Sequence, residues 1–251
     1  GATAGSAPTT STNETESLMK TKSLMSLAFL ITTLTDTSAG SLTNITIGLS
    51  ASYTLAESEQ IERSVKKFIL DAPQKTRVQI DDAFNLRTIV VFTIPDARYD
   101  SPAYRVRMLA QPLTSLTLWF RQARTNLASG VMTNRATVRV PEYLDFVAAA
   151  GGEAHSVLLL GNPMMEYPTE PSFSMAGGEE GPRVPSDGHF AASLQQSPYG
   201  TAERKDRLRG SQISWCYGSD NVWSNGLAKT LVPRFWVLFA KQQGATLTVF
   251  T

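Results

Sequence analysis

Residues 210–251, GSQISWCYGSDNVWSNGLAKTLVPRFWVLFAKQQGATLTVFT, decide the fold class. Residues 213–217 form a short apolar run that ends in a turn cluster, and residues 246–251 form a second run. The residues between them that follow helical spacing are Leu227, Leu231, Phe235, Leu238 and Phe239. Gly244 stands where a glycine ends a helix, because glycine takes the left-handed conformation without steric cost. Strand, helix and strand in this order predict two parallel strands joined by a right-handed crossover.

Two further apolar runs, residues 88–94 and 157–160, read as strands of the same sheet. Neither run alternates between apolar and polar residues, which is typical of strands that are covered on both faces in a parallel sheet. We therefore expect residues 88–94, 157–160 and 213–217 to be adjacent, parallel and buried.

The N-terminal part of the chain adds a tail, a hairpin and a helix. Residues 1–17 have almost no apolar side chains and predict a disordered tail or tether, which favours export to the periplasm or the cell exterior. Residues 45–49 alternate as a half-buried strand, and we expect them to form a hairpin with the apolar residues 24–34. Residues 19–40 also have the layout of a secretory signal, so a core element and a signal-like segment both remain open. Residues 57–70 read as an amphipathic helix.

The expected architecture is thus a single α/β domain over residues 18–251, a doubly wound, mostly parallel sheet with an N-terminal hairpin and helix. Residues 164–210 form a long insertion rich in Gly, Pro, Ser and Glu, with little periodicity. Such a stretch in a compact domain is usually a functional loop or disordered. We expect it to lie as a lid over a crevice of the sheet.

Composition excludes several kinds of partner. The chain has 23 basic and 22 acidic residues, a formal net charge of +1, which provides no field to attract nucleic acid or an anionic membrane. The single cysteine, Cys216, excludes an internal disulfide and a thiolate zinc cluster, and its apolar surroundings predict an inert core thiol. No apolar run reaches the roughly 20 residues that span a bilayer.

Polar residues follow three of the predicted strands and predict a binding site. In an open α/β sheet, ligands bind beyond the carboxyl ends of the strands, where the strand order reverses. The expected site residues are Asp96, Arg98, Asp100, Asn162, Asp187, His189, Ser219 and Asp220. Carboxylates gathered in a crevice favour protonation unless a cation lies between them. We expect Arg98 to be that cation, so an internal arginine–carboxylate network without a cofactor is favoured, and a divalent metal at Asp96 is the alternative.

The alternation of strands and helices, the polar strand ends and the closing strand–helix–strand unit resemble a von Willebrand factor A-type domain over about residues 87–251. That family binds a divalent metal through an Asp-x-Ser-x-Ser loop after its first central strand. The matching loop is expected at residues 96–100, where Arg98 and Asp100 replace the serines and the guanidinium would repel a cation. The resemblance implies a non-catalytic binding or interaction module with a protein partner, within a larger assembly.

A hydrolase is the alternative. Residues 157–161 are similar to the nucleophile-bearing strand of serine esterases of the Gly-Asp-Ser type, and residues 186–189, Ser-Asp-Gly-His, are similar to their Asp-x-x-His block. The nucleophile position, however, holds Asn162, and the spacing from Asp187 to His189 is one residue short. Nucleophilic catalysis requires a nucleophile and base within hydrogen-bond reach, so an enzyme would hold His189 against a carboxylate or hydroxyl in a concave pocket.

Overall fold

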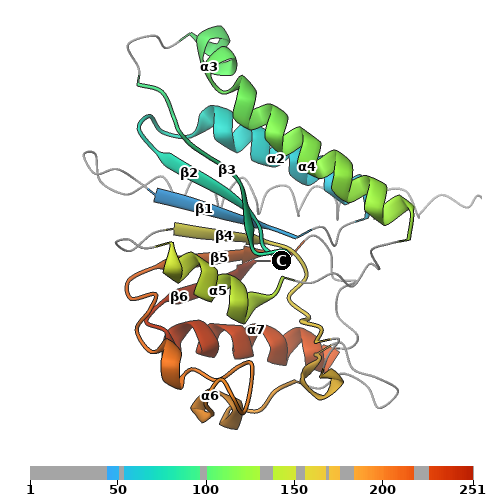
Figure 1. Cartoon of the computed structure of the whole chain (residues 1–251), viewed down its shortest axis with the longest axis vertical. Helices are drawn as coiled ribbons and strands as arrows, with labels where there is room; N and C mark the ends of the chain where they lie inside the picture. The colour runs from blue at the N-terminus through green and yellow to red at the C-terminus, as the bar shows by residue number, and fades with distance from the viewer. Residues whose placement is uncertain are drawn as a thin grey trace, which may run out of the picture.

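The computed structural model describes residues 44–50, 54–96, 101–130, 138–150, 156–167, 170–175, 184–217 and 226–250. These residues form a six-stranded, mostly parallel sheet with helices on both faces, which confirms the predicted α/β class (Figure 1). The strands are β1 (Asn44–Leu49), β2 (Arg77–Asp82), β3 (Arg87–Thr93), β4 (Ser156–Leu160), β5 (Gln212–Cys216) and β6 (Thr246–Phe250). The helices are α2 (Leu55–Asp71), α3 (Pro102–Met108), α4 (Ala110–Ala128), α5 (Val140–Ala149), α6 (Gly188–Ala191) and α7 (Gly226–Gln242).

The strand order is β3-β2-β1-β4-β5-β6. Strands β1, β2, β4, β5 and β6 run parallel, with Ile47 opposite Ile80 on one side and Leu158 on the other. From β1 the chain moves outward to β2 and β3, and then returns to β4 on the other side of β1. The order therefore reverses between β1 and β4, which is the point where doubly wound sheets bind their ligands.

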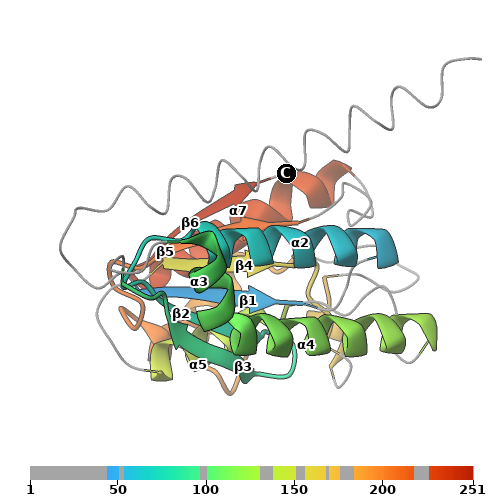
Figure 2. The ribbon, with the colours of Figure 1, turned by 90° about the horizontal axis from the view of Figure 1, so that it is seen from above.

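Two apolar clusters hold the layers together. Helices α2 and α4 lie side by side across one face (Figure 2), where Phe68 and Phe120 are fully buried against the apolar side chains of β1 and β2. Helix α2 begins at a capping box in which Thr54 and Glu57 satisfy each other's backbone N–H groups. Helices α5 and α7 cover the other face, where Trp215 of β5 and Trp236 of α7 are fully buried.

The strand, helix and strand predicted from residues 210–251 are present as β5, α7 and β6. Strands β5 and β6 pair in parallel, as expected, with Ile213 opposite Leu247. Gly244 takes a φ of +82° just after α7, so its missing side chain is what lets the chain turn back there.

The prediction for residues 88–94 was wrong. Strand β3 is antiparallel to β2 and forms an edge of the sheet, and Val91 is 43% exposed. Only four residues separate β2 from β3, whereas a parallel connection needs a dozen or more, so the two strands form a hairpin. Residues 157–160 and 213–217, by contrast, are adjacent, parallel and largely buried, as predicted.

The prediction that residues 45–49 form one strand of an N-terminal hairpin is also wrong. These residues lie in β1, which has β2 on one side and β4 on the other and so has no free side for a hairpin partner. The tail at residues 1–17 and the apolar residues 24–34 lie outside the described residues. The predicted amphipathic helix is present as α2.

The described parts of residues 164–210 pack into the domain, and the lid interpretation is a further correction. Six apolar side chains of this segment lie in the cluster that α5 and α7 form; they are Met164, Met165, Met175, Phe190, Tyr199 and Leu208. The segment starts at the carboxyl end of β4 and ends where β5 begins, so it passes over α5 and α7 from one edge of the sheet to the other. Among the helices of the described ranges, none is long and apolar enough to cross a membrane.

Candidate functional site

The carboxyl ends of β1 and β4 meet at the point where strand order reverses. The N–H of Ser50 donates to the carbonyl of Leu160 at 2.9 Å, and the indole Nε1 of Trp215 donates to the carbonyl of Gly161 at 2.9 Å. A Cβ at Gly161 would lie 2.5 Å from the Cβ of Ser50 and 2.8 Å from a methyl carbon of Val138. The two strand ends are therefore packed together so closely that only glycine fits.

A tyrosine from α5 reaches across β1 at the same edge. Tyr143 is fully buried, and its ring lies directly over Gly48, where a Cβ would be 2.6 Å from the ring carbon Cε1. The Tyr143 hydroxyl donates to Oδ2 of Asp81 on β2 at 3.0 Å. Glycine at position 48 thus makes the space that lets the phenol cross β1 and reach the neighbouring strand.

Asp81 is a fully buried carboxylate whose described hydrogen-bond donors are all neutral. The Nε2 of Gln79 lies 3.1 Å from both carboxylate oxygens, and the Tyr143 hydroxyl and the side chain of Thr88 also donate. Burial raises the pKa of Asp81 above its ordinary value, while these three hydrogen bonds oppose the shift. Burial, and then the neighbouring Asp81, raise the pKa of Tyr143 well above its ordinary value. The phenol and the carboxylate therefore satisfy each other inside the protein.

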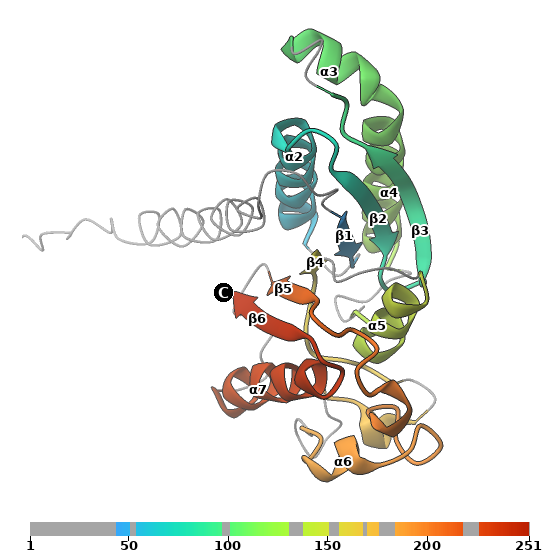
Figure 3. The same cartoon turned by 90° about the vertical axis from the view of Figure 1, so that its left-hand side faces the viewer.

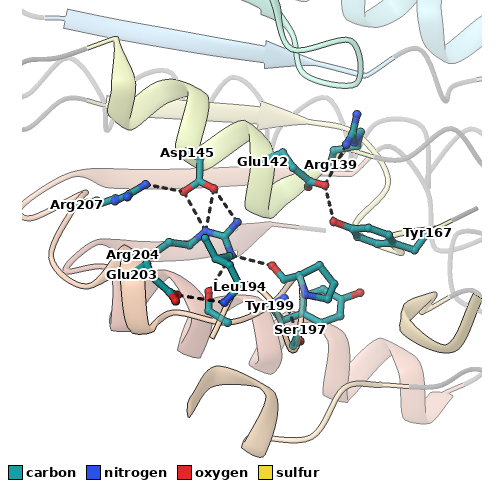
Figure 4. Close-up of polar contacts among 12 residues, drawn as sticks. Arg139, Glu142, Asp145, Tyr167, Leu194, Ser197, Tyr199, Glu203, Arg204 and Arg207 are labelled. Carbon is teal, nitrogen blue, oxygen red and sulfur yellow. Dashed lines mark hydrogen bonds and ion pairs between the residues drawn. The ribbon is translucent and has the colours of Figure 1, made fainter. Parts of the chain in front are cut away.

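A second polar network fixes the 164–210 segment to α5 (Figure 4). Arg204, 3% exposed, donates from Nε and Nη2 to the carboxylate of Asp145 at 2.7–2.9 Å. Its Nη1 donates to the carbonyls of Pro198 and Gly200 at 2.7 and 2.8 Å. Every nitrogen of this guanidinium has an acceptor, so Arg204 is occupied as a structural cross-link.

On the same helix α5, Glu142 accepts hydrogen bonds from the Tyr167 hydroxyl at 2.5 Å and from Arg139 at 3.1 Å. Burial raises the pKa of Tyr167, as does its hydrogen bond to Glu142. This contact ties the start of the 164–210 segment to α5, as Arg204 ties its later part.

His189 has a hydroxyl partner but no catalytic arrangement. Its Nδ1 lies 3.2 Å from the Oγ of Ser197, which is 3% exposed and also accepts from the N–H of Tyr199. The ring packs edge-on against Phe173 and Tyr199. Asp187, two residues away, pairs instead with the exposed Arg234 at 3.1 Å. The Ser-Asp-Gly-His residues therefore contact two different neighbours and do not form a relay.

The expected site residues that the structure describes, Asp96, Asn162, Asp187 and His189, do not form one shared site. Asp96 follows the antiparallel β3 and so lies at the amino edge of the sheet, where it pairs with Lys75 at 3.7 Å. Asn162 follows β4 at the carboxyl edge, is 9% exposed, and accepts from the N–H of Met164 at 2.8 Å. The four other positions after strand ends lie outside the described residues; they are Arg98, Asp100, Ser219 and Asp220.

Three residues do meet where the strand order reverses, which we call the switch point: Gly48, Asp81 and Tyr143. None of them was among the expected site residues. One signal in the sequence was available, because Asp81 and Asp82 directly follow the alternating residues Val78-Gln-Ile80 of a strand. The contact of Asp81 with Tyr143 joins residues 62 positions apart and has no local signature. Among the described residues, no group of three or more His, Cys, Asp or Glu side chains is placed to hold a metal ion.

The strand order and the helices on both faces define an α/β protein with a doubly wound sheet. Comparison with known proteins found no match to a family model, to a curated protein or to a solved structure.

Proposed function

We propose that this chain is a non-catalytic module that binds another protein. The observation that carries the proposal is the position of Tyr143: its ring packs on Gly48 near the carboxyl end of β1 and its hydroxyl binds Asp81, beside the point of strand-order reversal where doubly wound sheets bind ligands. The polar groups beside it, Asp81 and Gln79, are hydrogen-bonded within the protein. We therefore propose that the chain binds its partner through exposed side chains on the outside of the domain, as protein interaction modules do.

The resemblance to a von Willebrand factor A-type domain supports the same proposal, although residues 96–100 cannot be its metal loop, because the strand before them, β3, is an antiparallel edge strand and not a central one. The comparison is therefore extended to the loop after β1, which precedes residues 87–251. The first central strand is β1, and the residues from its end read Gly48-Leu-Ser-Ala-Ser52. Two serines have the Asp-x-Ser-x-Ser spacing, and Gly48 stands where the family has aspartate. A carboxylate at position 48 would collide with the Tyr143 ring. We therefore propose a module of this type that binds its partner without a metal ion.

The geometry around His189 favours this function over a hydrolase. A nucleophile must be open to its substrate and paired with a base that a third group orients. Ser197 is buried and its oxygen already accepts a backbone N–H, while Asp187 is paired with Arg234. The Ser197–His189 contact is better explained as a bond that holds the turn around Ser193 and Ser197 in place.

Two measurements on the full chain separate these functions. The chain immobilised on resin should retain the same protein from an extract of its source in EDTA and in magnesium, since the proposed binding needs no metal. Treatment with a fluorophosphonate probe should leave the chain unlabelled. Labelling that Ser197→Ala abolishes, together with turnover of activated esters, would establish the hydrolase instead. Retention only in magnesium would contradict the metal-independent mode.

A further inference from the structure

Strand β3 is the outermost strand on its side of the sheet (Figure 3), and no strand of the described ranges pairs with its outer side. We infer that a second copy of this chain pairs with it, β3 to β3, so that two sheets join into one. This inference rests on the proposed function of an interaction module and names its partner as the chain itself.

The chemistry of β3 is that of a strand that is open to pairing. Edge strands are commonly protected from association by charged side chains or proline. Residues 88–94 contain neither, and Val91 at their centre is 43% exposed. The protective features of β3 lie at its start, where Arg87 is exposed and the register against β2 shifts between Val90 and Thr88. Ile89, Val90 and Phe92 are partly buried against the cluster under α2 and α4, so the strand is held rigidly on that face. An edge that is packed on one face and uncharged from Thr88 to Ile94 needs little reorganisation to accept another strand.

The backbone of β3 presents hydrogen-bonding groups outward. Ile94 donates its N–H to Thr76 at 2.8 Å and accepts from the N–H of Lys75 at 3.0 Å, so its polar groups face the β2 side. In an antiparallel pair these directions alternate from residue to residue. The N–H and C=O groups of Val91 and Thr93 therefore point away from β2. In a pair centred on Val91, the Val91 residues of the two copies can form a pair of backbone hydrogen bonds with each other, whereas Thr93 lies opposite Ile89, at the register shift of β3.

The apolar run is self-complementary when it pairs about its centre. The midpoint of residues 88–94 is Val91, so an antiparallel pair centred there covers the whole run of both copies. The ends carry opposite charges. Arg87, whose side chain is 64% exposed, pairs with Asp82 of its own chain at 3.4 Å, and Asp96, whose side chain is 44% exposed, pairs with Lys75 at 3.7 Å. Antiparallel pairing brings Arg87 of each copy near Asp96 of the other. Parallel pairing would place like charges together, which is why the antiparallel arrangement is favoured.

The register has a direct chemical test. Two cysteines at position 91 would face each other across the two-fold axis with Cα atoms about 5.5 Å apart, which is within the range of a disulfide. Two cysteines at position 93 would be offset by four residues, or about 14 Å. Val91→Cys should therefore give a disulfide-linked dimer on mild oxidation, whereas Thr93→Cys should not. The native Cys216 is buried and leaves the background low.

Sedimentation equilibrium of the full chain tests the association itself. The wild-type chain should show a concentration-dependent dimer, and Val91→Lys should be monomeric because two ammonium groups would meet at the axis. Leu118→Lys is the matched control, because Leu118 is 53% exposed on α4, and this variant should still dimerise. Circular dichroism of each variant establishes that it is folded.

A wild-type chain that stays monomeric at the highest concentration reached would overturn the inference, as would a dimer that persists in Val91→Lys. If Val91→Lys does not fold, the cysteine pair decides, because linking at position 93 but not at 91 contradicts the register. A monomeric chain that still retains another protein would leave the proposed function standing and remove only the self-association.

Discussion

Replacing Gly48 by alanine should destabilise the protein by overpacking, even though alanine is ordinarily well tolerated. The new Cβ would lie 2.6, 2.7 and 2.8 Å from three atoms of the Tyr143 phenol, closer than real Cβ atoms come to their neighbours. The ring is fully buried and its hydroxyl is bound to Asp81, so it cannot move aside without losing that hydrogen bond. Overpacking of this kind costs about 1–3 kcal/mol.

For a chain of this length the cost corresponds to a fall in melting temperature of about 2–12 °C. Differential scanning calorimetry and urea unfolding measure it, with Gly226→Ala as the control. A Cβ at Gly226 would have no atom within 4 Å, so that variant should be unchanged or slightly more stable.

The cause can be isolated with a second substitution. Tyr143→Leu removes the three ring atoms that the new methyl would meet, so Gly48→Ala should cost little in that background. The two changes should therefore couple by about the size of the clash. Equal costs of Gly48→Ala with Tyr143 and with leucine at that position would refute the steric explanation, and so would a neutral Gly48→Ala.

Three further predictions concern buried polar groups. Burial raises the pKa of Asp81 in the folded protein above 3.8, its ordinary value. The stability that Asp81 contributes is therefore lost as the pH rises from 3.8 through the folded pKa. Urea unfolding measured across this pH range should show Asp81→Asn gaining stability relative to the wild type. Arg204→Met should lower the free energy of unfolding by about 3 kcal/mol. This is near the low end for a broken buried ion pair, because the side chain of Asp145 is 27% exposed. The control is Arg234→Met, which breaks an exposed ion pair and should leave the free energy of unfolding unchanged. Burial raises the pKa of Cys216 to about 11, so iodoacetamide should alkylate it slowly in the native protein and rapidly in guanidinium, and fast native alkylation would contradict its placement.

The parts of the fold that the sequence predicts correctly are those with local signals. Residues 210–251 carry helical spacing, a terminating glycine and two flanking apolar runs, and they form β5, α7 and β6. Residues 157–160 are buried as their uninterrupted apolar character indicates.

The error at residues 88–94 arose because apolar character was given more weight than connection length. An apolar run shows that a strand has buried contacts and does not show which neighbours it has. The four residues between β2 and β3 are too few for a crossover, and this signal was present in the sequence. Because β3 is antiparallel, Asp96 lies at the opposite edge of the sheet from Asn162, and these two residues cannot share a site.

The contacts at the switch point and in the 164–210 segment could not be predicted from the sequence, because they join residues that are far apart along the chain. Tyr143 meets Asp81 only because α5 crosses β1 at a glycine, and Arg204 meets Asp145 across 59 residues. Low periodicity predicted a loop for residues 164–210. The scattered apolar side chains of this segment pack because α7 presents aromatic side chains to them. The ring of Phe190, for example, stacks on that of Phe235 with their centroids 4.7 Å apart.

The central proposal is that Tyr143, packed on Gly48 at the end of β1, leaves this edge of the sheet without a metal site. Calorimetric titration of the wild-type chain with magnesium, calcium and manganese tests it most directly. We expect no saturable binding tighter than millimolar for any of the three ions. Micromolar binding that Ser50→Ala abolishes and Asp96→Ala leaves intact would contradict the claim and place a working metal site at the end of β1.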